Sequence, residues 1–120
     1  MKNQTKQIAD RMKKNKTVLF LLFLFLQVFA NAQTILRVGP GQTYSNPVQA
    51  AAVAKPGDTI LIYPAVYTGP FFIENLKGTP DKWITLKGLN KEQVIFRGGS
   101  ESMHLTDPNS LRIMDLTIER

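Results

Sequence analysis

The only histidine of the chain, His104, is the first residue to consider for chemistry. The 120 residues contain no cysteine. A zinc site draws most of its ligands from histidine and cysteine, so we expect none. We predict that His104 is an ordinary surface or hydrogen-bonded histidine; the alternative is a place facing a binding groove.

Three acidic residues close together in sequence are the next candidates: Asp107, Asp115 and Glu119. Calcium binds six or more oxygen ligands, and no loop of this chain holds a dense acidic cluster. We therefore predict no metal site and no bound cofactor within the chain.

Basic and aromatic side chains suggest contact with an acidic polysaccharide. We predict that three basic residues lie at outward positions on strands: Lys87, Arg97 and Arg112. Their side chains are either solvated or in contact with a glycan. Some aromatic residues could stack on sugar rings, but core or turn packing is the expectation for most of Tyr63, Tyr67, Phe71, Phe72 and Trp83. Simple turn chemistry or an amide ladder is expected of the turn residues Asn75, Asn90 and Asn109.

One short helix is predicted before the strands that carry these side chains. Asn46 can cap it, and Pro47 suits its first turn. Residues 48–54 are rich in alanine, and Pro56-Gly57 follows them. The helix is too short to stand alone, so we expect it to cover an apolar surface.

Short apolar runs separated by turn formers indicate an all-β fold. After a first strand at residues 34–38, the runs are Thr59–Tyr63, Phe71–Ile73, Trp83–Leu86, Val94–Phe96, Met103–Leu105 and Leu111–Ile118. We expect two interleaved series, one beginning at Thr59, Trp83 and Met103 and the other at Phe71, Val94 and Leu111. A recurrence near 20 residues is typical of a coiled solenoid whose equivalent strands pair in parallel. An antiparallel sandwich is the less favoured alternative, because no tight Asn-Gly hairpin turn occurs.

Residues 1–32 have the three zones of a secretory signal peptide. The segment contains six basic residues, then an apolar run from Val18 to Leu26, and ends in Ala30-Asn31-Ala32, which suits signal peptidase. Cleavage there would leave one domain of 88 residues, Gln33 to Arg120, outside the cytoplasm. The alternative, an uncleaved anchor, has a short apolar run for a spanning helix.

The signal segment also accounts for most of the charge. The whole chain carries +6, but residues 33–120 hold nine basic and eight acidic residues. A nucleic-acid partner would require a basic patch in this remaining part. We therefore predict no nucleic-acid binding, and contact with the membrane only through the signal before cleavage.

The segment Val48–Ile60 resembles the start of right-handed parallel β-helix proteins of the pectin-lyase-like superfamily, especially chondroitinase B and alginate lyase-type enzymes. Residues 63–69 resemble the next family element, which usually has glycine where this chain has Ala65, and residues 111–118 resemble a recurrent coil strand. The resemblance implies a helix that caps the solenoid, followed by about three coils.

In these enzymes, lysine, arginine and calcium-binding acidic residues on later coils perform the reaction, so the resemblance assigns no catalytic residue here. It implies the N-terminal portion of a secreted protein that acts on or binds polysaccharide, with calcium a feature of later coils. A non-catalytic surface protein and an inactive fragment are the alternatives. Because Arg120 ends an apparent strand without a cap, we expect further coils beyond it and expect residues 33–120 alone to fold marginally.

Overall fold

The computed structural model describes residues 33–120, which contain one helix and nine strands. In chain order these are β1 (Ile35–Val38), α2 (Pro47–Val53), β2 (Thr59–Ile62), β3 (Ala65–Thr68), β4 (Phe71–Glu74), β5 (Ile84–Gly88), β6 (Val94–Arg97), β7 (Met103–Thr106), β8 (Leu111–Met114) and β9 (Thr117–Glu119). The signal-peptide prediction concerns residues 1–32, outside the described residues.

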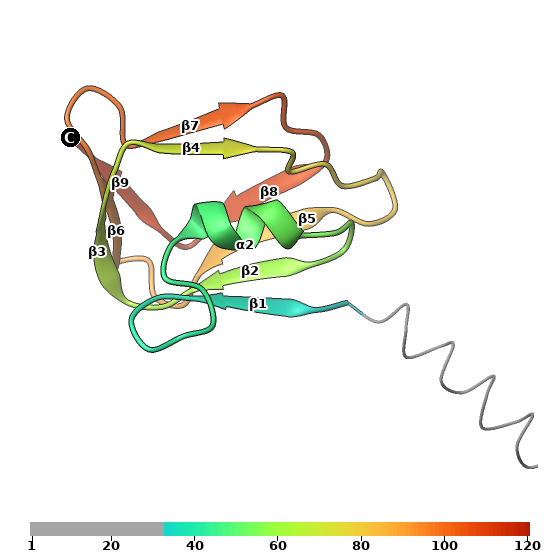
Figure 1. Ribbon diagram of the computed structural model, residues 1–120, viewed down its shortest axis with the longest axis horizontal. Helices are drawn as coiled ribbons and strands as arrows, with labels where there is room; N and C mark the ends of the chain where they lie inside the picture. Colours follow the sequence, from blue (N-terminus) through green and yellow to red (C-terminus); the bar gives the residue numbers. More distant parts are fainter. Residues whose placement is uncertain (1–32) are drawn as a thin grey trace, which may run out of the picture. The chain divides into compact units, whose positions relative to one another are not determined.

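The strands form three sheets in which every pair is parallel. Sheet A has the order β1-β2-β5-β8, sheet B the order β3-β6-β9, and sheet C pairs β4 with β7. From β2 onward the chain therefore visits the three sheets in turn and then returns to the first, one strand further along (Figure 1). Parallel pairing of this kind excludes the antiparallel sandwich for residues 33–120.

The predicted pairing of strands was wrong in detail. The predicted pairing of the strands at Thr59 and Trp83 is confirmed, since β2 pairs with β5 in sheet A. The strand at Leu111 then continues sheet A, and the strand at Met103 pairs with the strand at Phe71 in sheet C, so the rest of the two series is wrong. The missed strand is β3, four residues that lie between the turn formers Pro64 and Gly69. The single run predicted at residues 111–118 is divided into β8 and β9 by a bend at Asp115, where φ is 56°.

The core lies between the three sheets and is built from alternate residues of each strand. In register on sheet A, Ile60 and Leu86 are fully buried neighbours, while Thr59 and Thr85 lie on the outer face. Period-two alternation places one set of side chains inside and the other outside. Stacking of like residues from successive strands thus makes the core continuous along the sheets.

Aromatic packing joins sheets B and C within the core. Phe96 of sheet B is fully buried; its ring stacks on Tyr67 at a centroid distance of 5.0 Å. Phe71, which begins β4 of sheet C, meets the same ring edge-on at 5.8 Å. Offset-stacked and edge-to-face arrangements are the favourable ones for aromatic pairs. The core-packing prediction is confirmed for Tyr67 and Phe71.

Helix α2 covers the first strands, as predicted. The Asn46 side chain accepts a hydrogen bond from the backbone N–H of Gln49 (3.1 Å), and Pro47 begins the helix. Pro47, Ala50 and Ala51 are buried, and the helix packs against β1, β2 and β4 (Figure 1). The alanine-rich composition therefore serves two purposes, helix formation and close packing on the strands.

A buried carboxylate ties the segment after α2 to the start of sheet A. Asp58 accepts hydrogen bonds from the backbone N–H of Lys55 (2.8 Å) and of Thr34 (3.1 Å). The bond from Lys55 lies within the loop before β2, and the bond from Thr34 joins that loop to the residue before β1. They explain locally why an aspartate suits the position that enters β2.

Candidate functional site

The outer surface of sheet A gathers basic side chains and one tryptophan, which we call the cationic face: Arg37, Trp83, Lys87 and Arg112. Each cation occupies an outward position, because its strand neighbours point into the core. Arg37 and Lys87 share one register row, separated by Leu61. Arg112 lies in the adjacent row, beside Thr85.

No acidic residue balances these cations on the same sheet. The four strands of sheet A contain no aspartate and no glutamate. The ion pairs found within residues 33–120 lie on other faces, and none includes a member of the cationic face. The face therefore carries uncompensated positive charge, although residues 33–120 as a whole are nearly neutral.

Trp83 is fixed at the entrance to β5 with its ring accessible. Its indole N–H donates a hydrogen bond to the Pro80 carbonyl (3.2 Å), and the side chain is 45% exposed. The guanidinium of Arg112 lies over the ring, 5.7 Å from the centroid. This is the distance at which a cation is attracted to the face of an aromatic ring. An exposed aromatic surface and a positive charge are thus presented together.

The structure separates Arg97 from the other predicted cations. Arg97 lies on sheet B, where it is in register with Glu119 of the neighbouring strand. Its Nε donates to the Glu119 carboxylate at 2.8 Å, and its terminal nitrogen contacts the same oxygen. A glutamate one strand away therefore offsets its charge. The outward orientation predicted for Lys87, Arg97 and Arg112 is confirmed, but only Lys87 and Arg112 share a face.

Arg37 is the member of the cationic face that sequence reasoning missed. A signal was available, because Arg37 lies between the core residues Leu36 and Val38 and alternation turns it outward. Its place in the same row as Lys87 depends on the register of the strands, which the spacing of apolar runs along the sequence does not predict.

His104 lies on the outer side of sheet C, as a surface histidine with a carboxylate partner. Its Nδ1 is 2.6 Å from Oε1 of Glu101, and its ring is 5.7 Å from the ring of Phe72. Both members of the His104–Glu101 pair are about half exposed. The prediction of an ordinary hydrogen-bonded surface histidine is confirmed.

The acidic residues considered as metal ligands are dispersed. Asp107 forms an ion pair with Lys77, with 3.0 Å between Oδ2 and Nζ. Glu119 pairs with Arg97, and Asp115 lies at the bend before β9. No group of three histidine, cysteine or acidic side chains within residues 33–120 is arranged to hold a metal ion.

The predicted turn residues have roles in the backbone. Asn75 adopts a positive φ of 64° at the end of β4, and Asp107 does so at the equivalent place after β7. The Asn90 side chain accepts a hydrogen bond from the N–H of Glu92 (2.9 Å). The backbone of Asn109 pairs with that of Lys77 on the neighbouring turn. These contacts are typical of asparagine in turns.

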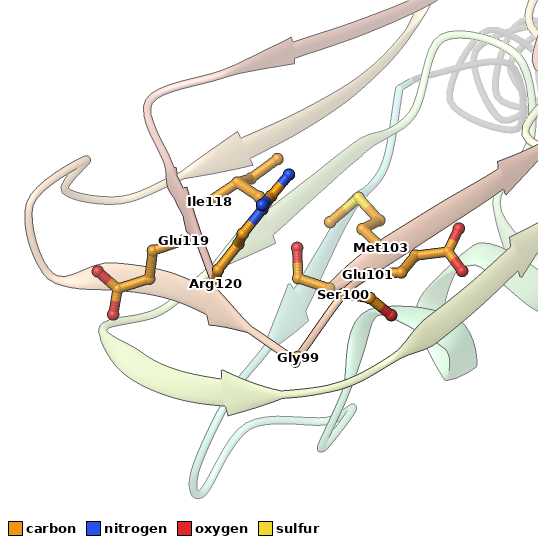
Figure 2. A pocket seen from close by; sticks show the side chains of 8 residues that line it. Gly99, Ser100, Glu101, Met103, Ile118, Glu119 and Arg120 are labelled. Carbon is orange, nitrogen blue, oxygen red and sulfur yellow. The ribbon is translucent and has the colours of Figure 1, made fainter.

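One hollow within residues 33–120 lies beside the ends of β6 and β9. It has a volume of about 350 Å³ and is lined by residues 99–103 and 118–120 (Figure 2). Glu101 and Glu119, its acidic residues, are already paired with His104 and Arg97. A smaller hollow of about 180 Å³ lies against α2 and includes Phe72 and Glu74. Neither brings together an acid, a base and a nucleophile.

Within residues 33–120, no helix has the length and apolar character needed to cross a membrane.

Comparisons with known proteins support the fold. No protein-family model and no curated protein matches the chain. Among solved structures, the chain is similar to a mutant of the PL6 family alginate lyase AlyGC, with a TM-score of 0.53 and 24% sequence identity. The match covers 73% of this chain and 11% of that enzyme, so the chain spans about a tenth of its length. This similarity and the three parallel sheets together indicate a fold of the parallel β-helix type.

Proposed function

We propose that residues 33–120 form the capped first coils of a longer, secreted, right-handed parallel β-helix protein that acts on or binds polysaccharide. In this proposal residues 1–32 direct export and are removed after Ala32. Further coils follow Arg120 and carry the catalytic groups. Kinship with the alginate lyase and chondroitinase B-type enzymes is part of the proposal.

The observation that carries this proposal is the uneven covering of the core. Along sheet A, Leu86 is fully buried, but its register partner Ile113 on β8 is 39% exposed. Along sheet B, Phe96 is fully buried, but its partner Ile118 on β9 is 56% exposed. Another coil paired with β8 and β9 would bury these inward-facing side chains, as α2 covers the opposite end.

Uneven covering also leaves strand edges without partners. The outer edges of β8 and β9 have no neighbouring strand within residues 33–120. Unpaired edges favour pairing with another chain unless they are covered. Continuation of the same coil pattern is the simplest covering, since it would extend all the sheets with the same parallel register.

The similarity to an alginate lyase supports the choice of polysaccharide as substrate class. Uronate lyases remove a proton beside a carboxylate and need a base, a proton donor and a positive group near the carboxylate. Residues 33–120 present positive groups but no such acid and base pair. We therefore place catalysis on coils beyond Arg120.

The test is expression of the complete open reading frame, including any coils beyond Arg120. N-terminal sequencing of the secreted product should begin at Gln33. Incubation with alginate should release unsaturated uronates, detected by their ultraviolet absorbance. Retention of full-length protein in the membrane would contradict export and cleavage, and the absence of unsaturated products from all uronate polymers would contradict the lyase activity.

Binding without catalysis is the second candidate function, and the cationic face favours it. Such a protein would be retained on a uronate polymer and would release no unsaturated product. Co-sedimentation with the insoluble calcium form of the polymer, followed by an absorbance measurement of the supernatant, separates the two candidates.

A further inference from the structure

We infer that the cationic face is a binding site for an acidic polysaccharide of the polyuronate class, with the sugar chain crossing the strands of sheet A. The inference rests on the proposed function and adds the location of the site and the charge of its ligand. The site lies outside both hollows and uses none of the paired acidic residues.

Charge is the first argument. The positive groups on β1, β5 and β8 have no carboxylate within the four strands of their own sheet, so the strands themselves offer a polyanion only neutral or positive side chains. By contrast, the exposed cations Arg97 and Lys77 are each paired with an acidic residue. A cation that has no acidic partner can bind a ligand without first breaking an ion pair.

The spacing of the cations suits a chain that runs across the strands. Arg37 and Lys87 are two strands apart in one register row, which corresponds to about 10 Å at the usual strand spacing. Arg112 lies one strand further on. A polyuronate carries one carboxylate on each sugar ring, so a chain laid across sheet A would present carboxylates along its length to these separated cations.

Trp83 offers an aromatic surface on which a sugar ring can pack, whereas a small inorganic anion would bind to the cations alone. Its ring is exposed, and its N–H is already bonded to Pro80, so the surface left for a ligand is mostly apolar. Sugar rings have an apolar face that packs on aromatic side chains. Because Arg112 lies over the same ring, a sugar that contacts Trp83 would hold its carboxylate within reach of the guanidinium.

A nucleic acid is the less suitable polyanion for this face. Nucleic-acid sites typically have larger basic patches with many phosphate contacts. Residues 33–120 contain nearly equal numbers of basic and acidic residues, and the cationic face has one aromatic ring. We therefore commit to the polyuronate and include a DNA oligonucleotide in the test.

The chain itself provides the probe, because Trp83 is its only tryptophan. Titration of the full-length chain with oligogalacturonate at low salt should change the Trp83 emission and protect the ring from quenching by acrylamide. Neutral malto-oligosaccharide should produce no saturable change. Binding should weaken steeply as salt is raised, because exposed charges are screened.

Matched variants locate the site. The double variant Lys87→Gln/Arg112→Gln should weaken oligogalacturonate binding at least tenfold, since each exposed cation contributes about fivefold. Arg97→Gln removes an arginine from sheet B and should change the affinity less than twofold. Trp83→Ala, followed by calorimetry, should also weaken binding. Circular dichroism of each variant confirms that the fold is kept.

Several results would overturn the inference: no binding of oligogalacturonate, an equal loss in Arg97→Gln, binding without any change at Trp83, or equal affinity for the DNA oligonucleotide. Failure of the proposed function is a separate outcome. If the complete protein binds or cleaves polyuronate while Lys87→Gln/Arg112→Gln has no effect, the function stands and the site lies elsewhere.

Discussion

Replacement of Phe96 by alanine should remove much of the stability of the fold. Phe96 is fully buried on sheet B, where it contacts Tyr67 of the same sheet and Phe71 of sheet C. Truncation of a buried phenylalanine to alanine costs about 3–5 kcal/mol. A domain of this size has a total stability of roughly 5–15 kcal/mol. The substitution therefore removes a large fraction of the free energy of unfolding.

Thermal unfolding followed by circular dichroism gives the measurement. A loss of about 4 kcal/mol in a domain of this length corresponds to a fall in Tm of roughly 15–30 °C. Phe96→Leu keeps most of the buried volume but loses the two aromatic contacts, which contribute about 0.5–1.5 kcal/mol each. It should therefore lie between the wild type and Phe96→Ala.

The control is Ile95→Ala, one position away on the outer face of the same strand. A partly exposed side chain should cost about 1 kcal/mol or less. Equal destabilisation by Ile95→Ala and Phe96→Ala would refute the assignment of inner and outer faces on β6. A fall in Tm of only a few degrees for Phe96→Ala would refute its central place in the core.

Three further predictions concern single contacts. Gly88→Ala should destabilise the fold by about 2 kcal/mol or more, because an added Cβ would meet the Asp115 carbonyl oxygen at 1.9 Å; a chemical denaturation curve like that of the wild type would contradict this stacking of turns. Asp58→Ala should cost about 1–3 kcal/mol, since two partly buried backbone N–H groups lose their acceptor; denaturation by urea measures the loss, and no change would contradict the role of this carboxylate. Burial raises the pKa of Tyr67 above its usual value, so the unfolded chain ionises first and stability should fall as pH rises above about 10. Tyr67→Phe should reduce this alkaline loss in pH-dependent melts, and an identical alkaline slope in the two proteins would refute the raised pKa.

Local patterns in the sequence predicted the helix and most strands. Asn46 and Pro47 begin α2 through chemistry that involves only nearby residues, and alternation around Ile84 and Leu86 identifies the inner face of β5. Such patterns depend on only a few consecutive positions, so they predict the helix and the inner face of a strand without knowledge of the tertiary structure. β3 escaped detection because its residues Ala65–Thr68 include a small inward residue and are bounded by turn formers.

Pairing between coils could not be predicted from spacing, because the connections differ in length. Two residues, Gly69 and Pro70, join β3 to β4, whereas residues 98–102 join the equivalent strands β6 and β7. A uniform repeat length therefore pairs β2 with β5 correctly but assigns the later strands to the wrong partners. The candidate site shows the same limit: alternation turns Lys87, Arg97 and Arg112 outward, but only the topology places Arg97 on a different sheet.

The most direct test of the account is a disulfide between strands that the coil register places side by side. Thr59 and Thr85 are register partners on the outer face of sheet A, about 4.8 Å apart at the usual strand spacing, and the chain has no cysteine of its own. Disulfides form readily at Cα separations of about 4.4–6.8 Å. The account predicts that Thr59→Cys/Thr85→Cys forms an intramolecular disulfide on mild oxidation and melts at a higher temperature, while Thr59→Cys/Arg97→Cys, which joins two different sheets, does not. Failure of the first pair to cross-link in folded protein, or equal cross-linking of the second, would contradict the parallel stacking of successive coils.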